Sequence, residues 1–208
     1  MKVLMINGSC NKNGCTYTAL SEIEKVLNAE NIETEIIQTG NAPIRDCIGC
    51  GGCGKNDGHC VFKDDIVNEI IEKAKTSDGF IFGTPVYYAH PSGRILSLLD
   101  RAFYAGKANF EYKPAAAIAS ARRAGTTASI DVLNKYFTIN NMPVVSANYW
   151  NMVHGSKPED VRQDLEGLQI MRILGGNMAW MLKCIEAGKA AGITPPVKED
   201  KIWTNFIH

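Results

Sequence analysis

The feature that most constrains the fold is an alternation between short apolar runs and longer stretches with helical periodicity. Each apolar run is rich in β-branched or aliphatic residues and is nearly continuous, which is typical of strands buried on both faces of a parallel sheet. The predicted strands cover residues 2–7, 33–39, 79–84, 115–120 and 142–148. Their alternation with helices predicts an α/β protein with an open, doubly wound parallel sheet.

The commonest order for five such strands is 2-1-3-4-5, the flavodoxin-like order, with helices on both faces. The last predicted helix begins at Ser156, where Glu159 would complete a capping box. It would place Cys184 on its buried side. Its glycine pair, Gly175 and Gly176, indicates either close helix packing or a bend.

Composition narrows the class of protein. The 208 residues predict one domain, 1–208, with a cysteine- and glycine-rich insertion at about 43–62. Twenty-two basic residues balance twenty-two acidic ones, so the net charge favours neither nucleic acid nor an anionic membrane. The apolar run near Met1 is too short for a secretory signal, and no run is long enough for a membrane span. We therefore expect a cytoplasmic protein whose cysteines stay reduced.

A ligand in such a sheet binds at the carboxyl ends of the strands, near the point where the strand order reverses. The loop after the first strand, residues 8–16, is rich in hydroxyl and amide groups and leads into a helix N-terminus that can stabilise an anion. It has neither the Walker A nor the Rossmann spacing. By itself it is also compatible with an ordinary capped turn.

Two more loops end at the same edge. Residues 83–93 include the adjacent tyrosines Tyr87 and Tyr88, whose flat rings suit contact with a ring system, although they could simply pack on the next helix. Residues 120–126 place Arg122 and Arg123 after a strand of small apolar residues, where they could equally be solvated charges. Together the three loops offer sites for a phosphate, a ring and a negative charge.

These loops resemble those of the NAD(P)H-dependent FMN reductases with a flavodoxin-like fold. NGSCNKNGCT resembles the phosphate loop of that family, GTPVYYAHPSGR its ring loop, and ASARRAGTT its third flavin loop. Cys10 and Cys15 stand where the family commonly has Pro and Asn. The resemblance implies FMN contacts from these residues: Ser9, Asn11, Asn13, Gly14, Cys15, Thr16, Thr84, Pro85, Val86, Tyr87, Tyr88, Ser120, Arg122, Arg123 and Gly125. It also implies Ser92 near the ring and Arg101 as a contact from another subunit.

The stretch CIGCGGCGKNDGHC, residues 47–60, holds four cysteines and five glycines. Successive Cys-x2-Cys turns are typical of iron–sulfur sites, and the glycines permit the tight turns that such a site needs. A zinc site with four cysteine ligands more often uses two separated pairs. Reduced thiols in a glycine-rich loop are the third interpretation.

The stretch also resembles the compact cysteine signature of the iron–sulfur flavoproteins, a branch of the same superfamily. That resemblance implies a [4Fe–4S] cluster beside FMN and a tetrameric assembly. The implied ligands are Cys47, Cys50, Cys53 and Cys60.

We therefore expect an oxidoreductase that passes electrons from NAD(P)H, or from ferredoxin, through FMN to a small-molecule or protein acceptor. FMN would carry out the hydride transfer, without a catalytic acid or nucleophile from the protein. One alternative is a cluster-free NAD(P)H:FMN, quinone or azo reductase. The other is a flavin-binding module that senses redox state. The resemblance also implies a homo-oligomer, either a dimer or a tetramer.

Overall fold

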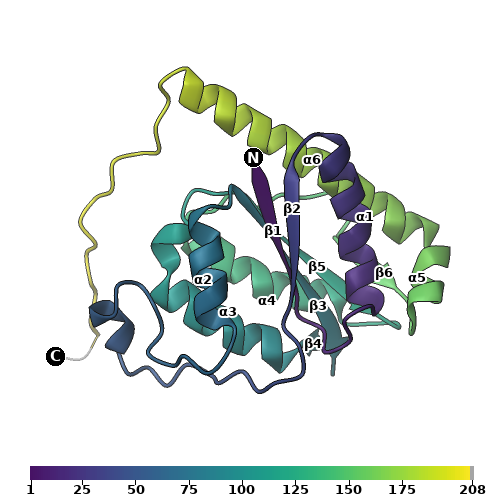
Figure 1. Ribbon diagram of the computed structural model, residues 1–208, viewed down its shortest axis with the longest axis horizontal. Helices are drawn as coiled ribbons and strands as arrows, with labels where there is room; N and C mark the ends of the chain where they lie inside the picture. Colours follow the sequence, from purple (N-terminus) through teal and green to yellow (C-terminus); the bar gives the residue numbers. More distant parts are fainter. Residues whose placement is uncertain (207–208) are drawn as a thin grey trace.

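The computed structural model describes residues 1–206, which form a parallel sheet between two layers of helices (Figure 1). The parallel strands are β1 (Lys2–Asn7), β2 (Glu33–Gln38), β3 (Gly79–Tyr87), β5 (Ala115–Ala121) and β6 (Met152–His154). They are ordered β2-β1-β3-β5-β6, and the two-residue β4 (His90–Pro91) pairs antiparallel with β3. The chain therefore has the predicted α/β fold and parallel order, with one short extra strand.

The helices cover both faces of this sheet. They are α1 (Cys15–Ala29), α2 (Val67–Lys75), α3 (Gly93–Ala105), α4 (Thr126–Ile139), α5 (Pro158–Gln163) and α6 (Leu165–Ala190), with 3-10 turns η1 (Gly52–Lys55) and η2 (Lys107–Asn109). In β1, Leu4 and Ile6 pack toward α2, α3 and α4, whereas Val3 and Met5 pack toward α1 and α6. Neighbouring side chains of a strand point to opposite faces, so the near-continuous apolar runs belong to strands covered on both sides.

The predicted fifth strand, residues 142–148, is wrong in position. Within it only Val144 bridges to Ala115, and the regular edge strand is β6, which begins at Met152. Between them the side-chain amide of Asn151 donates to the carbonyls of Ala117 and Val145, at 3.1 and 3.5 Å. The Asn151 side chain thus takes hydrogen-bonding positions that backbone N–H groups would fill in a regular β-ladder. The edge of the sheet is therefore interrupted at residues 146–150.

The predicted last helix is divided in two. The carboxylate of Asp160 accepts from the N–H groups of Ser156 and Lys157 at the start of α5, so Asp160 takes the role predicted for Glu159. Asp164 then caps α6 by accepting from the Gly167 N–H at 2.9 Å. Asp164 ends one helix and begins the next, which a single apolar stripe does not reveal.

Helix α6 continues through its glycine pair. A Cβ atom on Gly175 would lie 3.0 Å from the Cβ of Val26, so this glycine allows α6 to pack closely against α1. Cys184, predicted to be buried, is exposed on α6. Within residues 1–206, none of the helices combines the length and the apolar character that a membrane span requires.

Candidate functional site

The three candidate loops meet at the carboxyl edge of the sheet, and hydrogen bonds join each to its neighbours. The Ser92 hydroxyl donates to the carbonyl of Gly8 at 3.1 Å, and the Gly8 N–H donates to the carbonyl of Gly83 at 2.8 Å. The hydroxyls of Thr16 and Ser120 lie 2.8 Å apart, with both residues buried. The first loop is therefore fixed to both of the others.

The second and third loops are joined by close packing at a glycine. Gly125 has a φ of +98°, and a Cβ atom there would lie 2.4 Å from the Cα of Ala89. Tyr88 and Ala89 themselves form a left-handed turn, with φ values of 50° and 59°. Because only glycine allows this approach, Gly125 determines how close the tyrosine hairpin comes to the start of α4.

The first loop is organised from beneath by two polar residues at strand ends. The side-chain amide of Asn7 donates to the Oε1 atom of Gln38 at 2.5 Å, and Gln38 donates to the carbonyl of Ser9 at 2.6 Å. The Ser9 hydroxyl in turn accepts from the Asn11 N–H at 3.1 Å. Asn7 and Gln38 were not among the predicted site residues. The available signal was a polar residue at the carboxyl end of each of two adjacent strands.

The loop ends at an open helix N-terminus. Gly14 precedes α1 and has no side chain, so no side-chain cap covers the first N–H groups of this helix within residues 1–206. The Cys15 thiol donates to the carbonyl of Gly155 at 3.5 Å, and burial raises the pKa of this thiol. A neutral thiol therefore stands beside the N–H groups available to an anion. This donor set suits a phosphate group.

The tyrosine hairpin exposes aromatic surface beside that N-terminus. Tyr88 is fully exposed and Tyr87 is about half exposed, at 49%. The Tyr87 hydroxyl lies 3.9 Å from the Cys10 sulfur, and burial, with a smaller effect of Cys10, raises the pKa of Tyr87. Arg122 and Arg123 are exposed after β5, and the carbonyl of Arg123 lies 3.2 Å from the Nε2 atom of His154. Phosphate donors, aromatic rings and cations thus share one edge, a combination that fits FMN.

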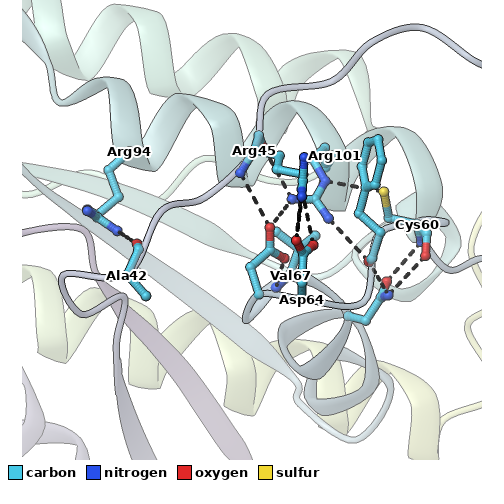
Figure 2. Close-up of polar contacts among 10 residues, drawn as sticks. Ala42, Arg45, Cys60, Asp64, Val67, Arg94 and Arg101 are labelled. Carbon is cyan, nitrogen blue, oxygen red and sulfur yellow. Dashed lines mark hydrogen bonds and ion pairs between the residues drawn. The ribbon is translucent and has the colours of Figure 1, made fainter.

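The cysteine segment, defined as residues 39–66, connects β2 to α2. It is irregular apart from η1, and two arginines of α3 bind it (Figure 2). Arg94 donates to the carbonyl of Ala42 at 2.5 Å, and Arg101 donates to the Cys60 sulfur at 3.2 Å. Arg101 is almost fully buried within its own chain, so the expected contact with another subunit is wrong.

The four predicted ligands line one pocket between the cysteine segment and the end of α3, together with Arg101 and Tyr104. All four are free thiols; Cys60 is buried, while the others are more accessible. In this conformation no group of three or more Cys, His, Asp or Glu side chains within residues 1–206 is arranged to hold a metal ion. Four thiols facing one pocket nevertheless form a donor set that suits iron or zinc.

Comparison with known proteins relates these features to a family. Residues 1–157 match the family described as NADPH-dependent FMN reductase. An iron–sulfur flavoprotein from Methanocaldococcus jannaschii is 34% identical over 195 residues, covering 89% of this chain and 100% of that protein. A second iron–sulfur flavoprotein from that organism is 30% identical over 190 residues, covering 83% of this chain and 92% of that protein.

Solved structures show the same fold at lower identity. A flavodoxin from the domain Archaea superposes with a TM-score of 0.60 at 16% identity, over 88% of this chain and 99% of that chain. A flavone reductase gives a TM-score of 0.68 at 19% identity, over 89% of this chain and 64% of that chain. These matches confirm the predicted flavodoxin-like fold.

Proposed function

Because the chain belongs to the NADPH-dependent FMN reductase family and is an FMN-dependent oxidoreductase, we propose that it moves electrons between FMN and a [4Fe–4S] cluster. NAD(P)H or reduced ferredoxin is the electron donor, and a small molecule or a protein is the acceptor. The observation that carries the proposal is that Cys47, Cys50, Cys53 and Cys60 line a single pocket. Relatives at 34% and 30% identity that carry the name iron–sulfur flavoprotein support it.

At the carboxyl edge of the sheet, where the loops 8–16, 83–93 and 120–126 meet, the protein binds and orients FMN. Bound FMN supplies both two-electron and one-electron chemistry. The N–H groups at the start of α1 and the hydroxyls of Ser9 and Thr16 would hold the phosphate. The exposed hairpin carrying Tyr87 and Tyr88 would contact the flavin ring.

At the cysteine pocket, the protein would supply thiolate ligands from a glycine-rich backbone. Gly49 and Gly51 have φ values of 64° and 66°, a conformation that side chains disfavour. These turns would let Cys47, Cys50 and Cys53 approach one centre when iron and sulfide are present. The soft sulfur donors favour iron–sulfur chemistry or zinc over hard cations.

Iron and acid-labile sulfide per FMN, measured in protein purified without oxygen, test the proposal. About four of each per flavin are expected. Cys50→Ser should lose them, whereas Cys184→Ser, on the exposed face of α6, should keep them. Zinc without sulfide would identify a zinc site. FMN with neither metal nor sulfide would favour the cluster-free reductase.

The electron donor needs a separate measurement. FMN-loaded protein is mixed without oxygen with NADPH, NADH or reduced ferredoxin, and loss of the flavin's visible absorption is followed. Rapid reduction by a nicotinamide nucleotide is expected. Slow reduction by all three donors, with FMN bound, would favour a redox-sensing module.

We further propose a homo-oligomer, because large aromatic side chains are left exposed. Tyr88, Tyr149 and Trp150 are each at least half exposed, and the rings of Tyr149 and Trp150 pack edge to face. Exposed aromatic groups are enriched at protein interfaces. Light scattering that gives a monomer mass at micromolar concentration would contradict this proposal.

A further inference from the structure

Arg101 is a buried cation whose donors converge on the cysteine segment (Figure 2). Its Nε–H donates to the Cys60 sulfur at 3.2 Å. Its Nη1 donates to Asp65 and, at 3.2 Å, to the carbonyl of Arg45, while Nη2 donates to the carbonyl of Phe62 at 3.4 Å. The guanidinium therefore binds the backbone before and after the stretch 47–60, while its Nε–H donates to the sulfur of Cys60.

Asp65 fixes the direction of this guanidinium. Its carboxylate forms an ion pair with Arg101, and the side chains are 1% and 3% exposed for Arg101 and Asp65. The other carboxylate oxygen accepts from the N–H of Val67 at 3.2 Å, so Asp65 is held at the start of α2. Because the fork is rigid, pairing one side with Asp65 directs Nε toward Cys60.

Cys60 is held from its backbone as well. Its N–H donates to the Asn68 side chain at 2.8 Å, and the Asn68 amide donates back to the Cys60 carbonyl at 2.9 Å. Within residues 1–206, Cys60 is the one cysteine among the four pocket thiols whose sulfur takes part in a hydrogen bond. One ligand position is therefore oriented in advance, while the other three lie on the glycine-rich turns.

We propose that Arg101 is a positioning residue for the cluster, an inference that rests on the proposed function. It holds the Cys60 sulfur toward the pocket as the first ligand, and the three cysteines on the glycine-rich turns would complete the ligand set. With a cluster bound, the same N–H would hydrogen-bond a ligand sulfur and so stabilise the more negative, reduced form of the cluster. Hydrogen bonds to ligand sulfurs are among the factors that set cluster potentials.

Arg45 provides a matched control. Its guanidinium lies over the Phe62 ring at 5.2 Å, as that of Arg101 does at 5.4 Å. It pairs with the exposed Asp64 at 2.7 Å, and in the described part of the chain its guanidinium donates no hydrogen bond to the Cys60 sulfur. Replacing Arg45 therefore removes a neighbouring cation of the same type and leaves the sulfur hydrogen bond in place.

The test compares Arg101→Lys, Arg101→Gln and Arg45→Gln with the parent protein. Arg101→Lys keeps a cation beside Asp65 and so guards against misfolding, while it removes the Nε–H donor. The first readout is the midpoint potential of the cluster, followed by EPR in anaerobic, FMN-loaded protein. The second is the iodoacetamide alkylation rate of Cys60 after iron removal, mapped by mass spectrometry with Cys47 as the internal reference.

Both Arg101 variants should shift the cluster potential to more negative values and change the relative alkylation rate of Cys60 at least tenfold, because the thiolate is the reactive form and Arg101 is its hydrogen-bond donor. Arg45→Gln should change neither. An unchanged potential and an unchanged alkylation ratio in Arg101→Lys would overturn the inference. A parent protein without iron would overturn the cluster function and the claim about its potential, while the alkylation ratios would still decide whether Arg101 holds Cys60.

Discussion

The proposed flavin edge, formed by the loops 8–16, 83–93 and 120–126, and the cysteine pocket are built in different ways. The flavin edge consists of short loops that leave adjacent strands and are joined through buried hydroxyls and a close glycine contact. The cysteine pocket lies on the long segment 39–66, which is held to α3 mainly by side chains. The strands of the sheet position the loops of the first site. The second site lies on an inserted segment whose position depends on a few contacts made by charged side chains.

The two sites also lie toward opposite ends of one helix. Ser92, which hydrogen-bonds to the loop 8–16, precedes α3, whereas Tyr104, which lines the cysteine pocket, lies near its end. Twelve residues at about 1.5 Å of rise per residue separate them by about 18 Å along the helix. A change at one end should therefore leave the other intact, which the following variants test.

The largest effect is expected from Asp65→Ala. It leaves the Arg101 guanidinium buried without its anion, which costs about 3–5 kcal/mol of unfolding free energy. Asp64→Ala, in the exposed neighbouring pair, should lower the unfolding free energy far less, because solvent screens that pair. Urea denaturation measures both values, and limited proteolysis should cut the cysteine segment faster in Asp65→Ala. Equal losses in the two variants would remove the distinction between the pairs.

Gly125→Ala should destabilise the protein and weaken FMN binding at the carboxyl edge of the sheet. The left-handed φ and the contact with Ala89 predict a loss of about 2–4 kcal/mol in unfolding free energy. FMN binding should weaken at least about tenfold, equivalent to about 1.4 kcal/mol. Gly176→Ala in α6, where a Cβ meets open space, should be neutral or stabilising. FMN titration with an unchanged affinity would show that the hairpin contact does not shape the flavin site.

The exposed cations after β5 should have a smaller effect. If Arg122 or Arg123 stabilises negative charge on the reduced ring, its change to Ala lowers the FMN potential by about 20 mV, or about 1 kcal/mol for a two-electron couple. Arg162→Ala, in an exposed pair on α5, is the control. Redox titration against dyes measures the shift. The same potential in both variants and the parent would refute the assignment.

The smallest expected effect is on the ionisation of the Tyr87 phenol. Burial, followed by the contact with Cys10, raises the pKa of Tyr87 above its ordinary value of 10.0. The protonated Tyr87 phenol therefore stabilises the folded protein. This contribution is fully present below the pKa of the unfolded chain and is lost as the pH rises through the raised pKa of the folded protein. Alkaline absorbance titration should show late ionisation, and Cys10→Ala should bring it part of the way back. Ionisation of Tyr87 at its ordinary pKa in the parent protein would contradict this assignment.

Much of the fold could be predicted because apolar runs and helical periods are local properties. The interrupted edge at residues 146–150 could not, because Asn151 takes part in the ladder through its side chain. The divided last helix was missed because Asp164 caps α6 without disturbing the apolar stripe. At the site, the sequence pointed to the loops but not to Asn7 and Gln38, which act from beneath them.

By itself, the sequence determined the alternating α/β pattern, the loops at the strand ends and the close spacing of the cysteines, since each depends on neighbouring residues. Only the tertiary structure decided the role of Arg101. Its partners Arg45, Cys60 and Asp65 lie 56, 41 and 36 residues away in the chain. An arginine in a helix usually faces water, and what makes this one buried is an anion and a sulfur brought to it by a distant segment.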